Sequence, residues 1–312
     1  MKKLYSILKH YGFKGIIKRL IQKTRFINPL YYISYVVTII FLQIFDNSFF
    51  RGFLTFSDTL FHEHIRHKKY FLIEEFLKNH KNEVLHGPFK GLNLGLQINR
   101  DYTSIIPLTM GVYEEVVTET IFNKSSERTD FIDIGAAYGY FSIGVLKSKL
   151  FNYTVAYEID DECKKQINKL YRINKLKNEI KIFGEATESL IINHIDTGII
   201  KPSKSFFLID VEGFEFKLLT YDLLSYLKDA VILIEIHDFG DYNNTDYKKL
   251  IDRSKDFFDF IELRDNKRTL YKNDFLDNLR TDLKLLLLSE SRSMTQKWVL
   301  LTPKSKYIEK DK

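Results

Sequence analysis

The stretch TDFIDIGAAYGYFSIG, residues 129–144, passes from a strand pattern through a glycine turn into a helix pattern. Its apolar residues Phe131, Ile132 and Ile134 suit a strand that is buried on both faces. Gly135 supplies the backbone freedom for a tight turn, and Gly139 is expected to let the backbone approach a ligand closely. The stretch therefore predicts a ligand-binding strand–turn–helix unit in which the helix N-terminus points at the turn.

The glycine spacing of this turn separates two cofactor classes. A dinucleotide pyrophosphate is bound by G-x-G-x-x-G, whereas here Ala137 stands in place of the second glycine. Asp133 would repel a pyrophosphate and favours a cationic or amino-bearing cofactor. The turn therefore favours S-adenosylmethionine over NAD, with Tyr140 as a further expected cofactor contact. Other parallel α/β domains also carry a glycine between strand and helix, so this motif alone does not establish a cofactor site. The residues at the ends of the neighbouring strands provide the further evidence.

After this unit, strand patterns alternate with helix patterns. Strands are expected at Tyr153–Glu158, Glu179–Phe183, Ser205–Val211 and Ala230–Ile236, and helices at Asp161–Asn174, Thr187–His194 and Glu215–Leu227. Such alternation predicts right-handed parallel crossovers and a doubly wound sheet that binds ligands at the carboxyl ends of its strands. Upstream, helices are expected at Tyr70–Lys78 and Gly111–Phe122, the second with Glu114, Glu115 and Glu119 on the face opposite its apolar residues.

Acidic residues at the ends of the second and third strands are the next cofactor candidates. Glu158 follows Asp133 by 25 residues and is expected to accept hydrogen bonds from both ribose hydroxyls of a nucleoside. Glu185 is the expected neighbour of the adenine ring. The alternative for Glu158 is a solvated charge at a strand end.

The fourth and fifth strands each end in ionisable residues two positions apart. Asp210 and Glu212 share one face of the fourth strand, and Glu235 and His237 share one face of the fifth. If the two strands are neighbours, these side chains converge, and they can hold a divalent cation or position a general base. His237 or Asp210 is the expected proton acceptor, and the metal role is the weaker expectation. Glu215 opens the next helix, where a negative charge also favours the helix dipole.

Composition and charge bound the architecture. With 312 residues, 45% of them hydrophobic, the chain is expected to form one catalytic domain at 70–312 after an N-terminal extension at 1–69. Its single cysteine, Cys163, excludes an intramolecular disulfide and agrees with a cytoplasmic location. Residues 1–45 contain eight Lys and Arg residues and no acid, against a net charge of +6 for the whole chain.

That charge distribution implies an anionic neighbour of the N-terminus, either a membrane surface or nucleic acid. Residues 27–45 are uncharged and aromatic-rich but hold Asn, Pro and Gln, so we expect an interfacial segment at the inner membrane surface more than a spanning helix. An N-terminal helical subdomain that packs on the core is the alternative.

Four motifs together resemble those of one family. They are FIDIGAAYGYFS at 131–142, AYEID at 156–160, the D-x-E-G-x-E run from Asp210 to Glu215, and Glu235-Ile236-His237. The sequence over about residues 87–302 resembles the FkbM-type methyltransferases, which are class I enzymes that use S-adenosylmethionine. The Asp-Val-Glu-Gly-Phe-Glu strand end is the motif that distinguishes this family from other methyltransferases.

The resemblance implies a Rossmann-like, mainly parallel seven-stranded sheet with helices on both faces. Strands at Phe257–Leu263 and Trp298–Thr302 would form its closing antiparallel hairpin around a helix at Asp274–Glu290. It also implies methyl transfer to a hydroxyl, often on a sugar of a glycan, glycolipid or natural product. The protein would then align the acceptor oxygen and remove its proton. The polar loop that holds Arg292 is expected to border the acceptor pocket, where Arg292 would contact an anionic or hydroxyl-rich acceptor; the alternative is a solvated side chain.

Two other classes of function remain as alternatives. A non-catalytic membrane-associated scaffold would have no need for Glu158 together with the acidic strand ends. A nucleic-acid methyltransferase would agree with the basic N-terminus, but the sequence lacks an N-P-P-Y-like base-flipping motif and a basic catalytic domain, so nucleic acid is not the expected acceptor.

Overall fold

The computed structural model describes residues 65–80, 82–95, 102–237, 245–290, 292 and 295–304. The chain divides into two compact units, Met1–Leu72 and Ile73–Lys312. Of the first unit only residues 65–72 are described, and they begin a helix at 65–79. The basic segment 1–45 and its uncharged part lie outside the described residues, so membrane contact stays a prediction. Within the described ranges, no helix is both long and apolar enough to cross a bilayer.

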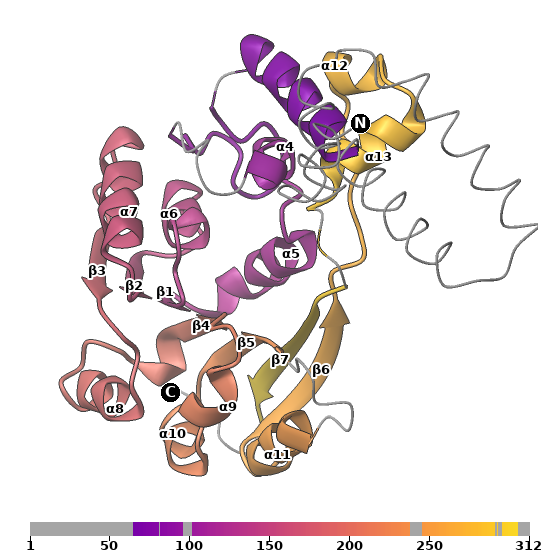
Figure 1. The fold of residues 1–312 in the computed structure, drawn as a ribbon. Coiled ribbons are helices and arrows are strands. Elements are labelled where there is room, and N and C mark those ends of the chain that lie inside the picture. Colours follow the sequence, from indigo (N-terminus) through magenta and orange to yellow (C-terminus); the bar gives the residue numbers. More distant parts are fainter. Residues whose placement is uncertain are drawn as a thin grey trace, which may run out of the picture. The chain divides into compact units, whose positions relative to one another are not determined.

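The second unit is built on one seven-stranded sheet (Figure 1). The strands are β1 (Asp130–Ile134), β2 (Tyr153–Tyr157), β3 (Glu179–Phe183), β4 (Ser205–Ile209), β5 (Val231–Glu235), β6 (Phe258–Arg264) and β7 (Lys297–Pro303). Their order is β3-β2-β1-β4-β5-β7-β6, with β7 antiparallel to its neighbours β5 and β6, and with β1 to β5 parallel to one another. The predicted mainly parallel seven-stranded sheet is therefore confirmed, and β1 and β4 lie side by side at its centre.

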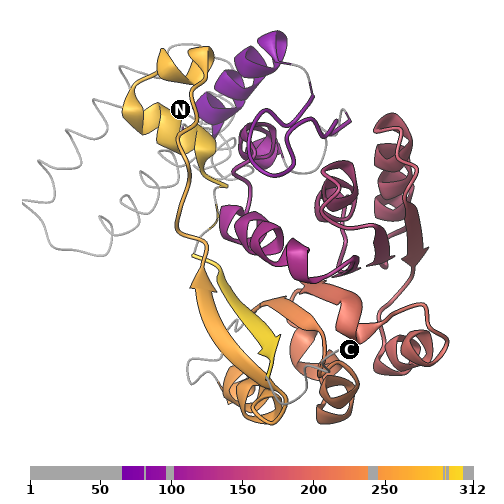
Figure 2. The same ribbon diagram turned by 180° about the vertical axis from the view of Figure 1, so that it is seen from behind.

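Helices cover both faces of this sheet (Figures 1 and 2). They are α4 (Ile105–Met110), α5 (Glu115–Lys124), α6 (Tyr140–Lys147), α7 (Asp161–Ile173), α8 (Glu188–Asp196), α9 (Glu215–Leu218), α10 (Tyr221–Tyr226), α11 (Thr245–Ser254), α12 (Asp274–Asp277) and α13 (Thr281–Leu288). Alternate residues of β4 serve opposite layers: Phe206 and Leu208 pack with α5–α7, and Phe207 and Ile209 pack with α8–α11. Burial of β4 on both faces explains its almost wholly apolar sequence.

Two expected helices are each divided in the structure. The helix predicted at Glu215–Leu227 was wrong as a single element, because the Thr220 side chain accepts a hydrogen bond from the Leu223 N–H and starts α10 as a separate helix. The helix predicted at Asp274–Glu290 is replaced by α12 and α13, with a turn in which the Leu279 N–H bonds to the Leu276 carbonyl. Local hydrogen bonds of this kind do not change the spacing of the apolar residues. The break between two helices therefore could not be predicted from that spacing.

The two turn glycines are explained by close contacts inside the protein. Gly135 has φ +89°, and a Cβ there would lie 1.7 Å from the backbone carbonyl oxygen of Asp210. Gly139 has φ +83°, and a Cβ there would lie 2.9 Å from Ile167 on α7. Glycine thus lets the end of β1 touch the end of β4 and lets α6 begin against α7.

Gly135→Ala is expected to destabilise the fold, because a residue with a Cβ is strained at this φ and would collide with backbone that cannot move aside. We expect a loss of about 1–3 kcal/mol from backbone strain alone, measured by urea unfolding with the fluorescence of the single tryptophan, the buried Trp298. Gly184→Ala is the control, because nothing lies within 4 Å of its added Cβ. Equal losses in the two variants would contradict this explanation.

Candidate active site

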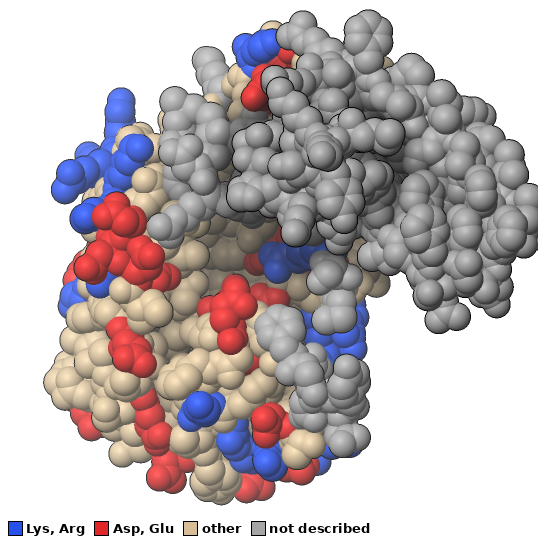
Figure 3. Space-filling model, viewed as in Figure 1, with Lys and Arg blue, Asp and Glu red and all other residues tan. Residues whose placement is uncertain are grey.

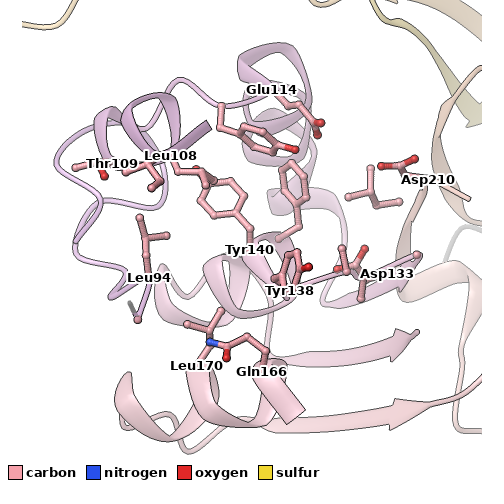
Figure 4. A pocket seen from close by; sticks show the side chains of 18 of the residues that line it. Leu94, Leu108, Thr109, Glu114, Asp133, Tyr138, Tyr140, Gln166, Leu170 and Asp210 are labelled. Atoms are coloured by element: carbon pink, nitrogen blue, oxygen red, sulfur yellow. The ribbon is translucent and has the colours of Figure 1, made fainter. Parts of the chain in front are cut away.

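A cavity of about 670 Å³ opens where the carboxyl ends of the central strands meet the segment before α5. Asp133 comes from β1, Asp210 follows β4, and Glu114 comes from the chain before α5 (Figure 4). On the opposite side of the cavity lie Gln166 and Leu170 of α7. The space-filling view shows acidic residues gathered beside a hollow on this face (Figure 3).

Glu158 organises the turn that lines one end of this cavity. One of its carboxylate oxygens accepts the Ala137 N–H at 2.7 Å, and the other accepts the Asp160 N–H at 2.7 Å. Ala137 has φ +43°, which is uncommon for a residue other than glycine. The hydrogen bond from its N–H to Glu158 helps to hold the turn in this conformation. Of the predicted cofactor residues, the structure places Asp133, Gly135 and Tyr140 in the cavity lining, while Gly139, Glu158 and the exposed Glu185 do not line it.

Asp133 is a buried carboxyl group. Its side chain accepts a hydrogen bond of 2.5 Å from Ser142 Oγ on α6. Burial raises the pKa of Asp133 to about 7; the Ser142 bond opposes this shift, and the nearby negative charge of Asp210 adds to it. The sequence interpretation treated Asp133 as an ordinary anion. In the structure its carboxyl group is buried, so the ionised form is costly unless a cationic ligand lies beside it.

Tyr140 brings a hydroxyl group that has no protein partner among the described residues, although its oxygen is buried. Its ring is held edge-on by Tyr113 and Phe89, with centroids 5.6 and 5.3 Å away. Burial raises the pKa of Tyr140, so the hydroxyl keeps its proton and stays a hydrogen-bond donor. A buried donor without a partner is costly, which makes Tyr140 a group that a ligand would satisfy.

The ionisable residues at the ends of β4 and β5 come together around His237. Its Nε2 lies 3.6 Å from carboxylate oxygens of both Asp210 and Glu212, and 3.8 Å from Glu235. On the other side of the ring, Nδ1 lies 3.4 Å from Glu215, which also accepts the His237 backbone N–H at 2.8 Å. Glu215 does open α9, and it also fixes the position of His237. The expected convergence of these strand ends is present in space.

The surroundings of His237, Glu235 and Asp210 shift the pKa values of these three side chains. Burial by itself lowers the pKa of His237, but the carboxylates of Glu215, Asp210 and Glu212 outweigh it and leave the pKa above its ordinary value. Burial raises the pKa of Glu235 to about 10, with the negative charge of Asp210 as the next cause. Burial also raises the pKa of Asp210, while His237 opposes that shift. Groups with shifted pKa values in a cavity are the kind that acid–base chemistry uses.

Asp210, Glu212 and His237 can each offer one ligand atom, and these atoms lie within 4.8 Å of one another. Two carboxylates and an imidazole suit a divalent cation. The same three groups suit proton transfer equally well, so the two roles that the sequence left open are both compatible with the geometry.

Sequence reasoning missed an ion-pair network beside this group, in which the exposed Arg292 meets buried carboxylates. Arg292 hydrogen-bonds to Glu114 and, at 2.8 Å, to Glu290, and its guanidinium lies 5.9 Å from the ring centroid of Tyr113. Arg292 Nη1 also lies 3.7 Å from Glu235. The network thus connects the segment after α13 to the acids at the end of β5 and before α5.

The placement of Glu114 and Glu115 on a solvent-facing side of a helix was wrong. Glu114 is 2% exposed and precedes α5 at φ +43°, and Glu115 is 4% exposed and accepts the Thr269 N–H at 2.6 Å. Glu114 and Arg292 are 178 residues apart, so no local spacing could connect them. The one signal in the sequence was that Arg292 stands in a polar loop expected to border the acceptor.

Comparisons with known proteins give structural likeness only. No protein-family model matches the chain, and no curated protein matches its sequence. A structure of an rRNA methylase from Streptococcus thermophilus has a TM-score of 0.40 at 10% identity, over 60% of this chain and 95% of that one. An O-methyltransferase from Bacillus cereus in complex with SAH has a TM-score of 0.40 at 12% identity, over 67% of this chain and 94% of that one.

A tRNA (m1A22) methyltransferase from Streptococcus pneumoniae, assigned that activity only provisionally and bound to S-adenosyl-L-methionine, has a TM-score of 0.37 at 13% identity, over 59% of this chain and 71% of that one. Likeness at this level supports no inference about activity, so the function has to be argued from the site itself.

Because the pKa of Asp133 is raised, the stability of the folded protein is expected to fall with rising pH, and Asp133→Asn is expected to remove this part of the pH dependence. Between an ordinary pKa of 3.8 and a folded value of about 7, the folded protein keeps a proton that the unfolded chain releases, so stability falls as the pH rises through this window. The loss between about pH 4.5 and pH 7 should be smaller in Asp133→Asn by on the order of 2–4 kcal/mol, measured by urea unfolding. Asp130→Asn, at the partly exposed start of β1, is the control. Parallel pH curves for the wild type and Asp133→Asn would contradict the prediction.

Proposed function

We propose that the protein is an S-adenosylmethionine-dependent O-methyltransferase of the FkbM type that acts on a sugar hydroxyl of a glycan, glycolipid or natural product. The observation that supports the proposal is one cavity that joins the β1 turn, braced by Glu158, to the carboxylates Asp210, Glu212 and Glu235, against which His237 lies outside the lining. The turn supplies a nucleoside-type site and the second group supplies acid–base chemistry, and methyl transfer to a hydroxyl needs both. The sequence motifs that resemble this family occupy the same two places.

The residues around the turn suit the proposed cofactor. The buried Asp133 carboxyl and the unpartnered Tyr140 hydroxyl are groups that an amino-bearing cation with polar edges would satisfy. A volume of about 670 Å³ lies within the range of roughly 300–1,000 Å³ of small-molecule sites. When bound, the cofactor's sulfonium supplies an activated methyl group. Glu158 would hold the ribose, and Asp133 and Tyr140 would hold the polar edges.

Asp210 is assigned the role of general base in this proposal. Its raised pKa brings a carboxylate closer to the operating pH, which is where a base is most effective. His237, held by Glu215 on its far side, stabilises the negative charge of Asp210 before the proton arrives. A divalent cation held by Asp210, Glu212 and His237 is the alternative way for the same residues to activate the hydroxyl.

Glu158→Gln is expected to weaken S-adenosylmethionine binding by about 10–100-fold, because hydrogen bonds from ribose hydroxyls to a charged group are worth roughly 1.5–3 kcal/mol. The glutamine keeps the size of the side chain and one oxygen for the turn. Isothermal calorimetry measures the affinity. Glu127→Gln, in the exposed 3₁₀ turn before β1, should bind as the wild type does. Unchanged affinity in Glu158→Gln would remove Glu158 from the cofactor site.

Asp210→Asn and His237→Ala are each expected to lower turnover by roughly 10²–10⁴-fold while cofactor affinity stays nearly intact, because the first removes the proton acceptor and the second removes the group that stabilises its charge. Turnover is followed as alkali-stable methyl label passed from S-adenosylmethionine to a carbohydrate extract. Asp222→Asn, on the exposed part of α10, is the control.

If both site variants keep full turnover, the carboxylate–imidazole group is structural and the chemistry lies elsewhere. A chelator arm separates the two modes of activation. Loss of wild-type turnover in a chelator, with recovery on adding Mg²⁺ or Mn²⁺, would replace the general-base assignment by the cation alternative.

A further inference from the structure

We infer that Glu290 is a positioning residue of the acceptor site: it fixes the guanidinium of Arg292, so that Arg292 Nη1 is left to donate hydrogen bonds to an oxygen of the acceptor. The inference rests on the proposed function and adds to it a residue that acts through another. It is carried by the hydrogen bonds that Glu290 accepts and by the nitrogen of Arg292 that these bonds leave over.

Glu290 accepts hydrogen bonds from three separate segments of the chain. Its Oε1 accepts the backbone N–H of Glu114 at 2.9 Å and a bond from Arg268 Nη2. Its Oε2 accepts a bond of 2.8 Å from Arg292 Nε. The side chain of Glu290 is 2% exposed, so water competes little for these bonds. One carboxylate thus connects the chain before α5, the chain after β6 and the chain after α13.

Glu290 is itself held in place from both sides. Arg268 also forms two bonds of 2.8 Å to Asp265, whose side chain is 1% exposed. On the other side, the bond to the Glu114 N–H holds a residue with φ +43°, which is uncommon for a residue other than glycine. The Glu114 carboxylate is the second hydrogen-bond partner of Arg292. Glu290 therefore helps to fix both carboxylates to which Arg292 is bonded.

These bonds use two of the three nitrogens of the Arg292 guanidinium. Nε donates to Glu290, and Nη2 donates to Glu114 and, at 3.3 Å, to the Tyr113 hydroxyl. In the part of the chain that the structure describes, Nη1 makes no hydrogen bond, and its ion-pair neighbour Glu235 lies at 3.7 Å. Arg292 is exposed and lines the cavity, and Glu235 lines it too. The N–H groups of Nη1 are therefore available to a ligand.

A guanidinium suits this division of roles. It is planar and always charged, so fixing Nε and Nη2 also fixes the direction of Nη1. His237 lies within 3.8 Å of both Glu235 and Asp210, so an acceptor oxygen bound by Nη1 lies near the proposed base. Hydroxyl, carboxylate and phosphate oxygens all accept such a bond. The arrangement thus determines where the acceptor lies and leaves its charge open.

The test separates acceptor binding from turnover and from cofactor binding. The full-length protein is incubated with saturating methyl-labelled S-adenosylmethionine and increasing amounts of a carbohydrate extract from cells that lack the protein. Arg292→Gln is expected to raise the apparent KM for the extract by about 10–100-fold, while kcat and S-adenosylmethionine affinity change by less than about threefold. Glu290→Gln should raise the same KM, by a smaller factor. An unchanged KM in either variant, or a loss mainly in kcat or in cofactor affinity, overturns the inference.

The double variant tests whether Glu290 acts through Arg292. Arg292→Gln combined with Glu290→Gln is expected to have the KM of Arg292→Gln alone, because no arginine is left to position. A KM raised by the product of the two single factors overturns the positioning role. Arg280→Gln is the control: Arg280 is an exposed residue that pairs with Asp282 at 2.9 Å, does not line the cavity, and should leave the KM unchanged.

Arg292→Lys keeps the inference testable if circular dichroism shows that Glu290→Gln does not fold. A lysine ammonium is a single point charge and cannot hold two carboxylates while presenting a third, fixed nitrogen to a ligand. The KM of Arg292→Lys is therefore expected to stay raised. A wild-type KM in this variant overturns the positioning role.

Failure of the inference and failure of the proposed function are distinguishable. Electrophoresis of the digested product at neutral pH shows whether a neutral or an anionic unit carries the label, and the same selective change in KM is expected for either. If the wild type labels sugars but Arg292→Gln keeps its KM, the function stands and the inference falls. If the wild type labels no fraction of the extract, the proposed function falls and the inference falls with it.

Discussion

The contact between the ends of β1 and β4 is the constraint on which the rest of the site depends. The backbone of Gly135 lies so close to the carbonyl of Asp210 that a methyl group would not fit between them, and the Asp210 N–H bonds to the Ile134 carbonyl at 2.9 Å. This contact places the turn at the end of β1 directly against the first acid at the end of β4. Two chemically different groups therefore share one cavity because two central parallel strands end side by side.

Buried charge is the second theme of the molecule. Glu114, Glu215 and Glu235 are almost fully buried, and the protein pairs them with a small number of cationic or hydrogen-bonding groups: Arg292 for Glu114, backbone N–H groups for Glu215, and Gln296 for Glu235. Burial of this kind seldom adds stability compared with apolar packing. These buried carboxylates lie in or beside the cavity. Burial there raises the pKa values of two of them, Glu114 and Glu235, and a cationic ligand would stabilise their ionised forms.

The parts of this arrangement that could be predicted from sequence are those with short-range signals. Apolar runs located the central strands and the ionisable residues that follow them. The strand alternation expected to pair Asp210 with Glu212 was wrong, because β4 ends at Ile209 and Glu212 has φ +51°. The Arg292–Glu114 pair joins residues 178 positions apart and has no local signal. Likewise, Gly135 was interpreted as a turn residue, but the reason that only glycine fits is a neighbour on another strand.

The central claim is that the cofactor lies on the β1 turn with its reactive end toward Asp210. A crystal structure of the protein soaked with S-adenosylhomocysteine tests it most directly. The account predicts ribose hydroxyls within hydrogen-bonding distance of the Glu158 carboxylate, and the sulfur in the part of the cavity that Asp210 lines. A nucleoside bound elsewhere on the sheet, with Glu158 untouched, would contradict it.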